Sequence, residues 1–314
     1  MEPLTASRTA LVTSLMRALH TRADPHPIIS DPWGDRLVPE AVLERVRATA
    51  RSALSSGAVA GSETASNLIV DRWLRASVAY AGVITRSRYA EDALHAAVAR
   101  GVRQYVLIGA GFDSYALRTP PEARDVEIFE VDHPATQGLK RQRIVECGVS
   151  LRDPVHFLAA DLSKERLGDV LSGSCFNSAA PAFFSWLGVT MYLTREANVA
   201  SLRAIARASA PGSELVFTYL DEAAFRDESD SAPPSVAALR RSVESIGEPF
   251  LSGFEPEALA RDLRGVGFEL EEDLDDFQTA QRYDPRGLNG LQPAGQSRIA
   301  RARVMDAGEQ RAGS

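Results

Sequence analysis

The sequence predicts an α/β protein whose seven-stranded, mostly parallel sheet is doubly wound and carries an N-terminal helical cap. Two observations predict this class. From residue 104 onward, short apolar runs alternate with stretches of helical periodicity, which is typical of parallel strands joined by crossover helices. The first of these runs, 104–108, ends abruptly in two glycines, as strands do where they lead into a ligand-binding turn.

Length and composition are compatible with one large α/β domain and restrict its partners. The chain has 314 residues, 45% of them apolar, and its 35 basic and 42 acidic residues give a net charge of −7. Because there is no global positive field, neither nucleic acid nor a membrane surface is predicted as a partner. No feature of the sequence indicates an oligomeric state.

Cysteine, histidine and hydropathy patterns predict a soluble, cytoplasmic protein without a metal. Cys147 and Cys175 are isolated, which indicates neither a disulfide framework nor a cysteine metal site and is typical of a reducing compartment. The histidines show no pair at metal-ligand spacing. The N-terminal residues carry several charges, so they lack the apolar core of a signal peptide, and no apolar run of about eighteen residues follows.

Residues 1–88 are predicted to form a helical cap or lid. Apolar residues recur at helical spacing over 6–19, and Pro25 ends that pattern. Further helices are predicted over 39–85, with an interruption rich in Ala, Ser and Gly at 52–66. This all-helical part precedes the first strand.

Residues 89–314 are predicted to form the α/β core. A helix over 89–100 leads into the first strand, and the strands are predicted at 104–108, 127–131, 155–159, 182–187, 213–219, 267–271 and 298–304. Helical patterns fall between most of them, at 134–146, 196–208 and 256–263. After the fifth strand, a polar excursion near 221–250 is predicted to act as a lid, and the tail beyond Met305 is predicted to fray.

The turn after the first strand points to a ligand that contains a nucleoside. Gly109 and Gly111, with only Ala110 between them, let the backbone turn sharply and approach a ligand without obstruction by a Cβ atom. Asp132 ends the second strand about twenty residues later, where an acid that binds the ribose hydroxyls lies in nucleotide-binding βαβ units. These residues predict an adenosine-containing cofactor.

Two further positions bear on the identity of the cofactor. A dinucleotide fingerprint requires a third glycine where Ser114 stands, so a monoadenosyl cofactor fits better than NAD, and an NAD-dependent oxidoreductase is the alternative. Asp161 and Leu162 follow the third strand, where the acid would accept a hydrogen bond from an adenine amino group and the leucine would pack on the ring. The alternative role of Asp161 is an N-cap for a helix over 163–170.

Together these elements resemble the leucine carboxyl methyltransferase family, including its bacterial small-molecule O-methyltransferase branch, over nearly the whole chain. The matching pieces are Asp31-Pro-Trp, Thr85-Arg-Ser-Arg-Tyr, residues 104–113, Glu130-Val-Asp-His-Pro134 with Lys140, Asp161-Leu162, residues 186–193 and Ser252-Gly-Phe-Glu-Pro256. The resemblance implies a class I, Rossmann-like methyltransferase fold with a helical lid, and S-adenosyl-L-methionine as the cofactor.

The resemblance also implies particular site residues. An arginine before the first strand, Arg86, would bind the methionine carboxylate, with Arg88 as the competing assignment. The protein-modifying members of the family usually have Glu-Gly after the fourth strand, whereas this chain has Leu187-Gly188. Because leucine accepts no hydrogen bond, this departure favours the small-molecule or peptide-tailoring branch. The predicted cofactor-binding residues are Arg86, Gly109, Ala110, Gly111, Asp132, Asp161 and Leu162.

Methyl transfer needs little acid–base assistance, because displacement at an activated sulfonium methyl mainly requires a positioned nucleophile and exclusion of water. A carboxylate acceptor needs no base, whereas a phenol or alcohol would benefit from one, and the candidate catalytic residues are His133 and Tyr192. The predicted function is methyl-ester formation on a carboxylate of a small metabolite or peptide C-terminus. O-methylation of a hydroxyl or phenol of a secondary metabolite is the close alternative, and a noncatalytic cofactor-binding protein is a third.

Overall fold

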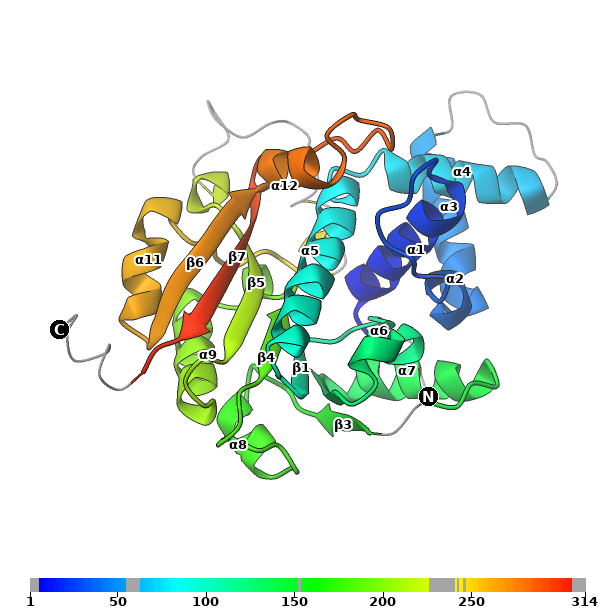
Figure 1. Cartoon of the computed structure of the whole chain (residues 1–314). Helices are drawn as coiled ribbons and strands as arrows, with labels where there is room; N and C mark the ends of the chain where they lie inside the picture. The colour runs from blue at the N-terminus through cyan, green and yellow to red at the C-terminus, as the bar shows by residue number, and fades with distance from the viewer. Residues whose placement is uncertain are drawn as a thin grey trace.

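A computed structural model describes residues 6–54, 63–151, 154–225, 241, 243–244 and 247–306. Its centre is one 7-stranded sheet in the order β3-β2-β1-β4-β5-β7-β6 (Figure 1). The strands are β1 (Gln104–Ile108), β2 (Glu127–Asp132), β3 (Val155–Ala159), β4 (Phe183–Trp186), β5 (Glu214–Leu220), β6 (Phe268–Asp275) and β7 (Ser297–Val304). Neighbours pair in parallel except at β7, which runs antiparallel to both β5 and β6. The predicted fold class is confirmed, and each predicted strand is present.

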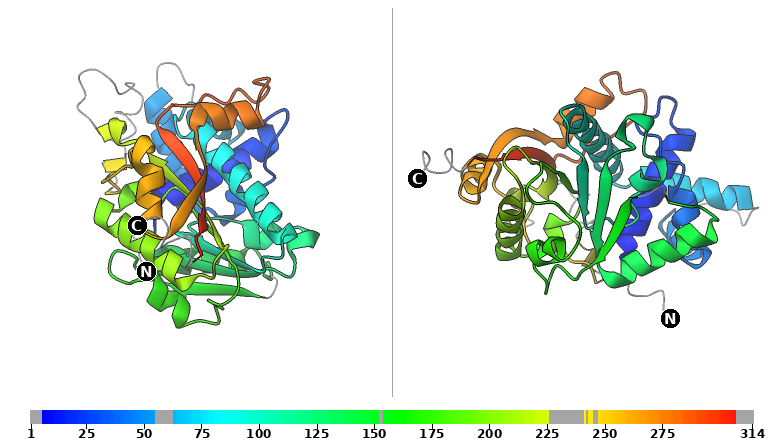
Figure 2. Two further views of the ribbon diagram at one scale, coloured as in Figure 1. Left: turned by 60° about the vertical axis from the view of Figure 1, so that its left-hand side comes forward. Right: turned by 60° about the horizontal axis from the view of Figure 1, so that its bottom comes forward.

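Helices cover both faces of the sheet, as the two views of Figure 2 show. The longer helices are α1 (Arg8–Ala23), α3 (Glu40–Leu54), α4 (Glu63–Arg75), α5 (Tyr80–Ala99), α7 (Pro134–Glu146), α9 (Arg195–Ala208), α11 (Pro256–Arg264) and α12 (Asp276–Tyr283). The shorter segments are α2 (Gly34–Leu37), α6 (Tyr115–Arg118), η2 (Pro121–Ala123), α8 (Leu167–Ser172), η3 (Thr190–Tyr192) and η4 (Glu222–Phe225). Buried residues of α8, α9 and α11 pack on one face, and those of α5 and α6 pack on the other.

The central strand β1 shows why a sheet of this composition is buried on both sides. All of its residues are buried. Val106 and Ile108 belong to one apolar cluster, whereas Tyr105 and Leu107 belong to the cluster on the opposite face. Successive side chains of a strand point to opposite faces, so a strand that is apolar at consecutive positions requires a cover on each side.

A separate apolar cluster holds the N-terminal helices together. It contains residues of α1, α3, α4 and the first turns of α5, among them Leu15, Leu19, Val46 and Leu74. In Figure 1 these helices lie on the right, beyond α5 and far from α11. The helix predicted over 6–19 is α1, which continues to Ala23.

The helix before the first strand is longer than predicted. α5 runs without a break, whereas the sequence predicted helices over 39–85 and a further helix over 89–100, with residues 86–88 between them. The hydroxyls of Thr85 and Ser87 donate to carbonyl oxygens one turn earlier in α5, at 3.0 and 2.8 Å, so these polar residues do not end the helix. The division into a cap (1–88) and a core (89–314) stays a prediction, and its boundary falls inside α5, which contacts both α1 and the sheet.

Three predicted segments lie wholly or partly outside the described residues. The interruption at 52–66 is described only at its two ends, and the tail is described only to residue 306. The excursion near 221–250 is described at 221–225, at 241 and 243–244, and from 247 onward. The lid role of this excursion therefore stays a prediction.

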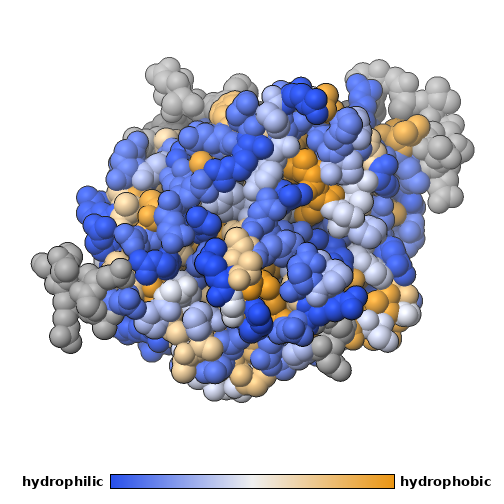
Figure 3. All heavy atoms as spheres, viewed as in Figure 1, coloured by the Kyte–Doolittle hydropathy of each residue, from blue (hydrophilic) through white to orange (hydrophobic). Residues whose placement is uncertain are grey.

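The surface is mostly polar on the face shown in Figure 3, where apolar residues form small, separate patches. Among the described residues, every helix is too short or too polar to cross a bilayer. The apolar residues of the chain are concentrated instead in the three buried clusters.

Candidate active site

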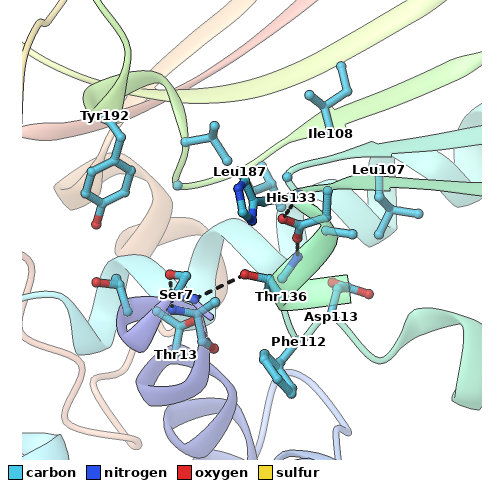
Figure 4. A pocket seen from close by; sticks show the side chains of 18 of the residues that line it. Ser7, Thr13, Leu107, Ile108, Phe112, Asp113, His133, Thr136, Leu187 and Tyr192 are labelled. Carbon is cyan, nitrogen blue, oxygen red and sulfur yellow. Dashed lines mark hydrogen bonds between the residues drawn. The ribbon is translucent and has the colours of Figure 1, made fainter. Parts of the chain in front are cut away.

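The carboxyl ends of β1, β2 and β4 open into one cavity of about 490 Å³ (Figure 4). The turns after these strands form one side of it. The other sides are formed by residues of α1, α5, α7 and η3 and by residues 247–251. Ligands of open α/β sheets bind at this edge of the sheet. The predicted site residues that line the cavity are Arg86, Gly109, Ala110, Gly111, Asp132, His133 and Tyr192.

The turn after β1 requires glycine at its first position. Gly109 has a φ of 66°, and a Cβ atom there would lie 2.5 Å from Cγ2 of Val189. The amide groups of Gly109 and Ala110 donate to the carbonyl oxygen of Val131 at 2.8 and 3.2 Å. The turn is thus tied to the end of β2 and packed against the segment after β4, which leaves its backbone facing the cavity.

Asp132 ends β2 with its carboxylate beside this turn. One oxygen accepts a hydrogen bond from the amide of Gly111, and the other accepts from the amide of His133 at 2.6 Å. Burial raises the pKa of Asp132, and the two amide donors oppose that shift. A carboxylate has further acceptor positions beyond these two, so Asp132 retains the capacity to bind hydroxyl groups in the cavity.

Arg86 points from α5 into the cavity beside Gly188. A Cβ atom at Gly188, whose φ is 70°, would lie 2.8 Å from a terminal nitrogen of Arg86. Within the described part of the chain, no hydrogen bond or ion pair involves the Arg86 side chain. Burial, together with the nearby Arg17 guanidinium, lowers the pKa of Arg86 to about 10, so the group is still charged at neutral pH. A half-buried cation without a partner among these residues favours binding of an anionic group.

The neighbouring arginines are already paired. Arg17 also lines the cavity, but its guanidinium contacts Asp31 at 2.8 Å and the Phe112 carbonyl oxygen at 2.7 Å. Arg88, the competing candidate for the carboxylate-binding role, forms an ion pair with Asp92 at 2.8 Å and does not line the cavity. The geometry therefore favours Arg86 for that role.

Asp161 and Leu162 are not brought into this cavity. Asp161 accepts hydrogen bonds from the amide and hydroxyl of Ser163 and from Lys164, at 3.1, 2.5 and 2.6 Å. The Lys164 ammonium and the Ser163 hydroxyl lower the pKa of Asp161 to about 2. Leu162 packs against the apolar cluster on the α8 and α9 face. The helix predicted over 163–170 begins only at Leu167, so Asp161 stabilises a turn before α8, and an adenine-binding role for these two residues stays a prediction.

Tyr192 and His133 both face the cavity (Figure 4). Burial raises the pKa of the Tyr192 phenol, which is therefore neutral at physiological pH. His133 is the N-cap of α7, and its Nδ1 accepts a hydrogen bond from the Ala135 amide at 3.3 Å. The Tyr192 ring contacts that of Phe250 with a centroid distance of 5.4 Å. A catalytic role for either residue stays a prediction.

The sequence did not indicate how α1 closes over the cavity. The carboxylate of Glu248 accepts hydrogen bonds from the first amides of α1, those of Arg8 and Thr9, at 2.9 and 3.3 Å. The Ser7 amide donates to the Thr136 hydroxyl of α7 at 3.1 Å (Figure 4). A carboxylate at a helix N-terminus is favourable, but no local pattern could have revealed contacts between residues so far apart in the sequence.

A smaller cavity of about 110 Å³ adjoins the first and shares Arg86, Gly188 and Tyr192 with it. Its lining is mainly apolar and includes Val78, Val83, Met191, Leu220 and Phe250. One acid, Asp276, also faces it, and burial raises the pKa of Asp276 to about 6.

Leu187, which stands where protein-modifying members usually carry glutamate, lines the larger cavity.

The chain is similar to known proteins over most of its length. The model of the leucine carboxyl methyltransferase family matches residues 10–206, more than half of the chain. YktD of Bacillus subtilis, which bears the provisional name of an S-adenosyl-L-methionine-dependent methyltransferase, is 29% identical over 89% of this chain and 93% of its own. A relative from Mycolicibacterium smegmatis with the same provisional name is 31% identical over 83% of both chains.

A solved structure shows the same fold. A protein from Thermobifida fusca, provisionally named a methyltransferase, superimposes with a TM-score of 0.55 at 20% identity and covers 83% of this chain and 94% of its own. At this identity the likeness concerns the fold alone. The comparisons give no support to the NAD-dependent alternative.

Proposed function

The chain belongs to the leucine carboxyl methyltransferase family and is an S-adenosyl-L-methionine-dependent methyltransferase, and we propose that it forms methyl esters on a carboxylate of a small metabolite or a peptide C-terminus. The observation that carries the site assignment is Arg86, which has no partner in the part of the chain that the structure describes and lies beside the glycine turn and Asp132 in a cavity at the carboxyl ends of the strands. A second, mainly apolar cavity next to Arg86 offers space for the acceptor.

The residues of the cavity fit the cofactor group by group. Arg86 would bind its carboxylate, because a guanidinium can donate two parallel hydrogen bonds to a carboxylate. Asp132 would accept from the ribose hydroxyls, and the Gly109–Gly111 turn allows close approach of the backbone. When bound, the cofactor supplies a sulfonium methyl group that is already activated for displacement. The protein then has to hold the acceptor in line and exclude water.

The acids and bases near the cavity already form hydrogen bonds within the protein, which supports an acceptor that needs no base, such as a carboxylate. Glu248 is bonded to the start of α1, Asp132 to two amides, and Nδ1 of His133 to the helix that it caps. Oδ2 of Asp276, which faces the second cavity, accepts from the amides of Ala294 and Gly295 at 3.2 and 3.0 Å. The Tyr192 phenol is protonated and can donate a hydrogen bond that orients an acceptor. A carboxylate is ionised at neutral pH and reacts without a base, whereas a phenol with a pKa near 10 benefits from one.

The apolar lining of the second cavity supports an acceptor with an apolar body, which agrees with a secondary metabolite or a capped peptide better than with a sugar. We also place the reaction in the cytoplasm. Both cysteines, Cys147 and Cys175, are free thiols, as is usual in a reducing compartment.

Incubation with methyl-labelled cofactor and a panel of matched acceptors tests the proposal. Each apolar carboxylic acid is paired with its primary amide, and a set of phenols is run in parallel. We expect label to enter the acids and to be released as methanol by mild alkali, since methyl esters hydrolyse there and aryl ethers do not. Alkali-stable label confined to the phenols would support the hydroxyl alternative. Cofactor binding without transfer to any acceptor would support the noncatalytic alternative.

A further inference from the structure

Three side chains of the kinds that bind metal ions, those of Glu127, His156 and Cys175, lie close together at the end of the sheet opposite to the cavity. Nε2 of His156 lies 2.8 Å from Oε1 of Glu127, and Sγ of Cys175 lies 3.4 Å from Nε2 and 3.6 Å from Oε1. One ligand atom from each residue lies within 4.8 Å of the other two. Among the described residues, this is the one cluster of three or more such side chains with this spacing.

The sheet register brings Glu127 and His156 together. His156 of β3 is the partner of Phe129 in β2, and Glu127 precedes Phe129 by two residues, so its side chain lies on the same face. The His156 ring stacks on Phe129 with a centroid distance of 4.8 Å. The positions of both ligands are thus fixed by strand pairing, although they are far apart in the sequence.

The loop after α8 holds Cys175 against these strands. The next residue, Phe176, packs edge-on against Phe129 with a centroid distance of 5.6 Å. The backbone N–H of Asn177 donates to the side-chain oxygen of Gln104 at 2.7 Å, and the backbone carbonyl oxygen of Asn177 accepts from the side-chain nitrogen of Gln104 at 3.0 Å. Cys175 is therefore anchored from its C-terminal side, while its thiol is exposed to solvent.

We propose that Glu127, His156 and Cys175 bind a Zn²⁺-class divalent cation, with water in the fourth position. Tetrahedral zinc with usual bond lengths separates sulfur from nitrogen and from oxygen by about 3.6 Å, and nitrogen from oxygen by about 3.4 Å. The sulfur distances of 3.4 and 3.6 Å already match these values. The nitrogen–oxygen distance of 2.8 Å is that of a hydrogen bond, which the ion would replace.

Binding requires small, local changes. Sγ of Cys175 is almost equally far from Nδ1 and Nε2, at 3.5 and 3.4 Å, so the His156 ring must turn to aim Nε2 at the ion. Rotation about the bond that carries a histidine ring is soft. The imidazole would bind in the form protonated at Nδ1, and the thiol would release its proton to solvent and bind as thiolate.

The surroundings of the cluster favour a divalent cation. The Glu127 carboxylate lies 3.6 Å from the Cys175 sulfur and attracts such an ion to this position. Sulfur, imidazole and carboxylate together form a ligand set typical of zinc rather than of magnesium or calcium.

The site would stabilise the fold and not take part in methyl transfer. Glu127 and Asp132 are the first and last residues of β2, so about 16 Å of strand separates the two sites. A bound ion would link β2, the edge strand β3 and the loop that carries Cys175. It is therefore expected to raise the Tm by several degrees and leave cofactor affinity unchanged.

Titration of the full-length, untagged protein with Co²⁺, followed by competition with Zn²⁺, tests this site. We expect one equivalent of Co²⁺ to give a thiolate-to-cobalt charge-transfer band, with a dissociation constant in the micromolar range or below, and Zn²⁺ to displace it. Cys175→Ser should abolish the band, Cys147→Ser should leave it unchanged, and His156→Ala should weaken binding at least tenfold. No band at a tenfold excess of Co²⁺, or a band lost only in Cys147→Ser, would refute the proposal.

Alkylation of the unmodified protein gives a second measurement that needs no variant. Zn²⁺ should slow the reaction of iodoacetamide at Cys175 and not at Cys147, as resolved by mass spectrometry. Equal rates at Cys175 with and without Zn²⁺ would contradict the proposal.

Discussion

Replacement of Arg86 by methionine should move cofactor affinity and stability in opposite directions. Arg86 is a half-buried cation for which the described residues provide no acidic partner, and its pKa falls to about 10 in the folded protein. A depressed pKa in a basic group means that its charge costs folding stability at neutral pH, here of the order of 1–3 kcal/mol. The same guanidinium should contribute about 1.5–3 kcal/mol to binding of the cofactor carboxylate.

Arg86→Met should therefore weaken S-adenosylhomocysteine binding about 10- to 150-fold. The Tm of the free protein should stay the same or rise, by about 2 °C for each kcal/mol regained. Arg88→Met is the matched control, because Arg88 pairs with the half-exposed Asp92 outside the cavity, and it should leave affinity unchanged. Calorimetric titration and thermal melts of the three proteins provide the test. A lower Tm with unchanged affinity in Arg86→Met would show that Arg86 is structural and would refute the reasoning.

Three other changes give separate tests. Asp132→Asn should weaken S-adenosylhomocysteine binding about tenfold or more, since the ribose hydroxyls would lose a charged acceptor; unchanged calorimetric affinity would mean that another acid holds the ribose. Lys140→Met should destabilise the protein by about 3–5 kcal/mol in urea unfolding, because Glu130, paired with Lys140 at 2.6 Å, would be left buried and charged. Adding Glu130→Gln to Lys140→Met should restore much of the lost stability. Equal stability of the single and the double variant would contradict this explanation. Burial raises the pKa of Asp276 to about 6, so the folded state binds the proton of this group more tightly than the unfolded state does. The contribution of Asp276 to stability should therefore fall as pH rises from about 4 to about 6, and Asp276→Asn should remove that component of the pH profile of stability. A profile of the variant parallel to that of the unmodified protein would contradict this role of Asp276.

The strands and the glycine turn could be predicted because their signals are local. An apolar run such as 104–108 must be covered on both faces, and a positive φ at Gly109 is a requirement of one position alone. The acid at the end of β2 follows from the geometry of a single βαβ unit. The strand bounds at 104–108 and 155–159 agree with the structure, and the others differ by a few residues.

Features that depend on distant contacts could not be predicted in this way. Helix α5 contacts both α1 and the sheet, and no local pattern across 85–89 shows that one unbroken helix packs against both. Closure of the cavity by Glu248 at the start of α1 joins residues that are 240 positions apart in the sequence. The three residues of the proposed metal site lack metal-ligand spacing in the sequence: Glu127 and His156 meet because β2 and β3 pair, and the loop after α8 brings Cys175 to them.

Parallel calorimetric titrations of the purified protein with S-adenosyl-L-methionine, S-adenosylhomocysteine and NAD test most directly whether the cavity at the strand ends binds the methyl donor. We expect binding of the first two in the micromolar range, no binding of NAD, and loss of affinity in Arg86→Met but not in Arg88→Met. Binding of NAD alone, or donor binding that is indifferent to both Arg86→Met and Asp132→Asn, would contradict this expectation.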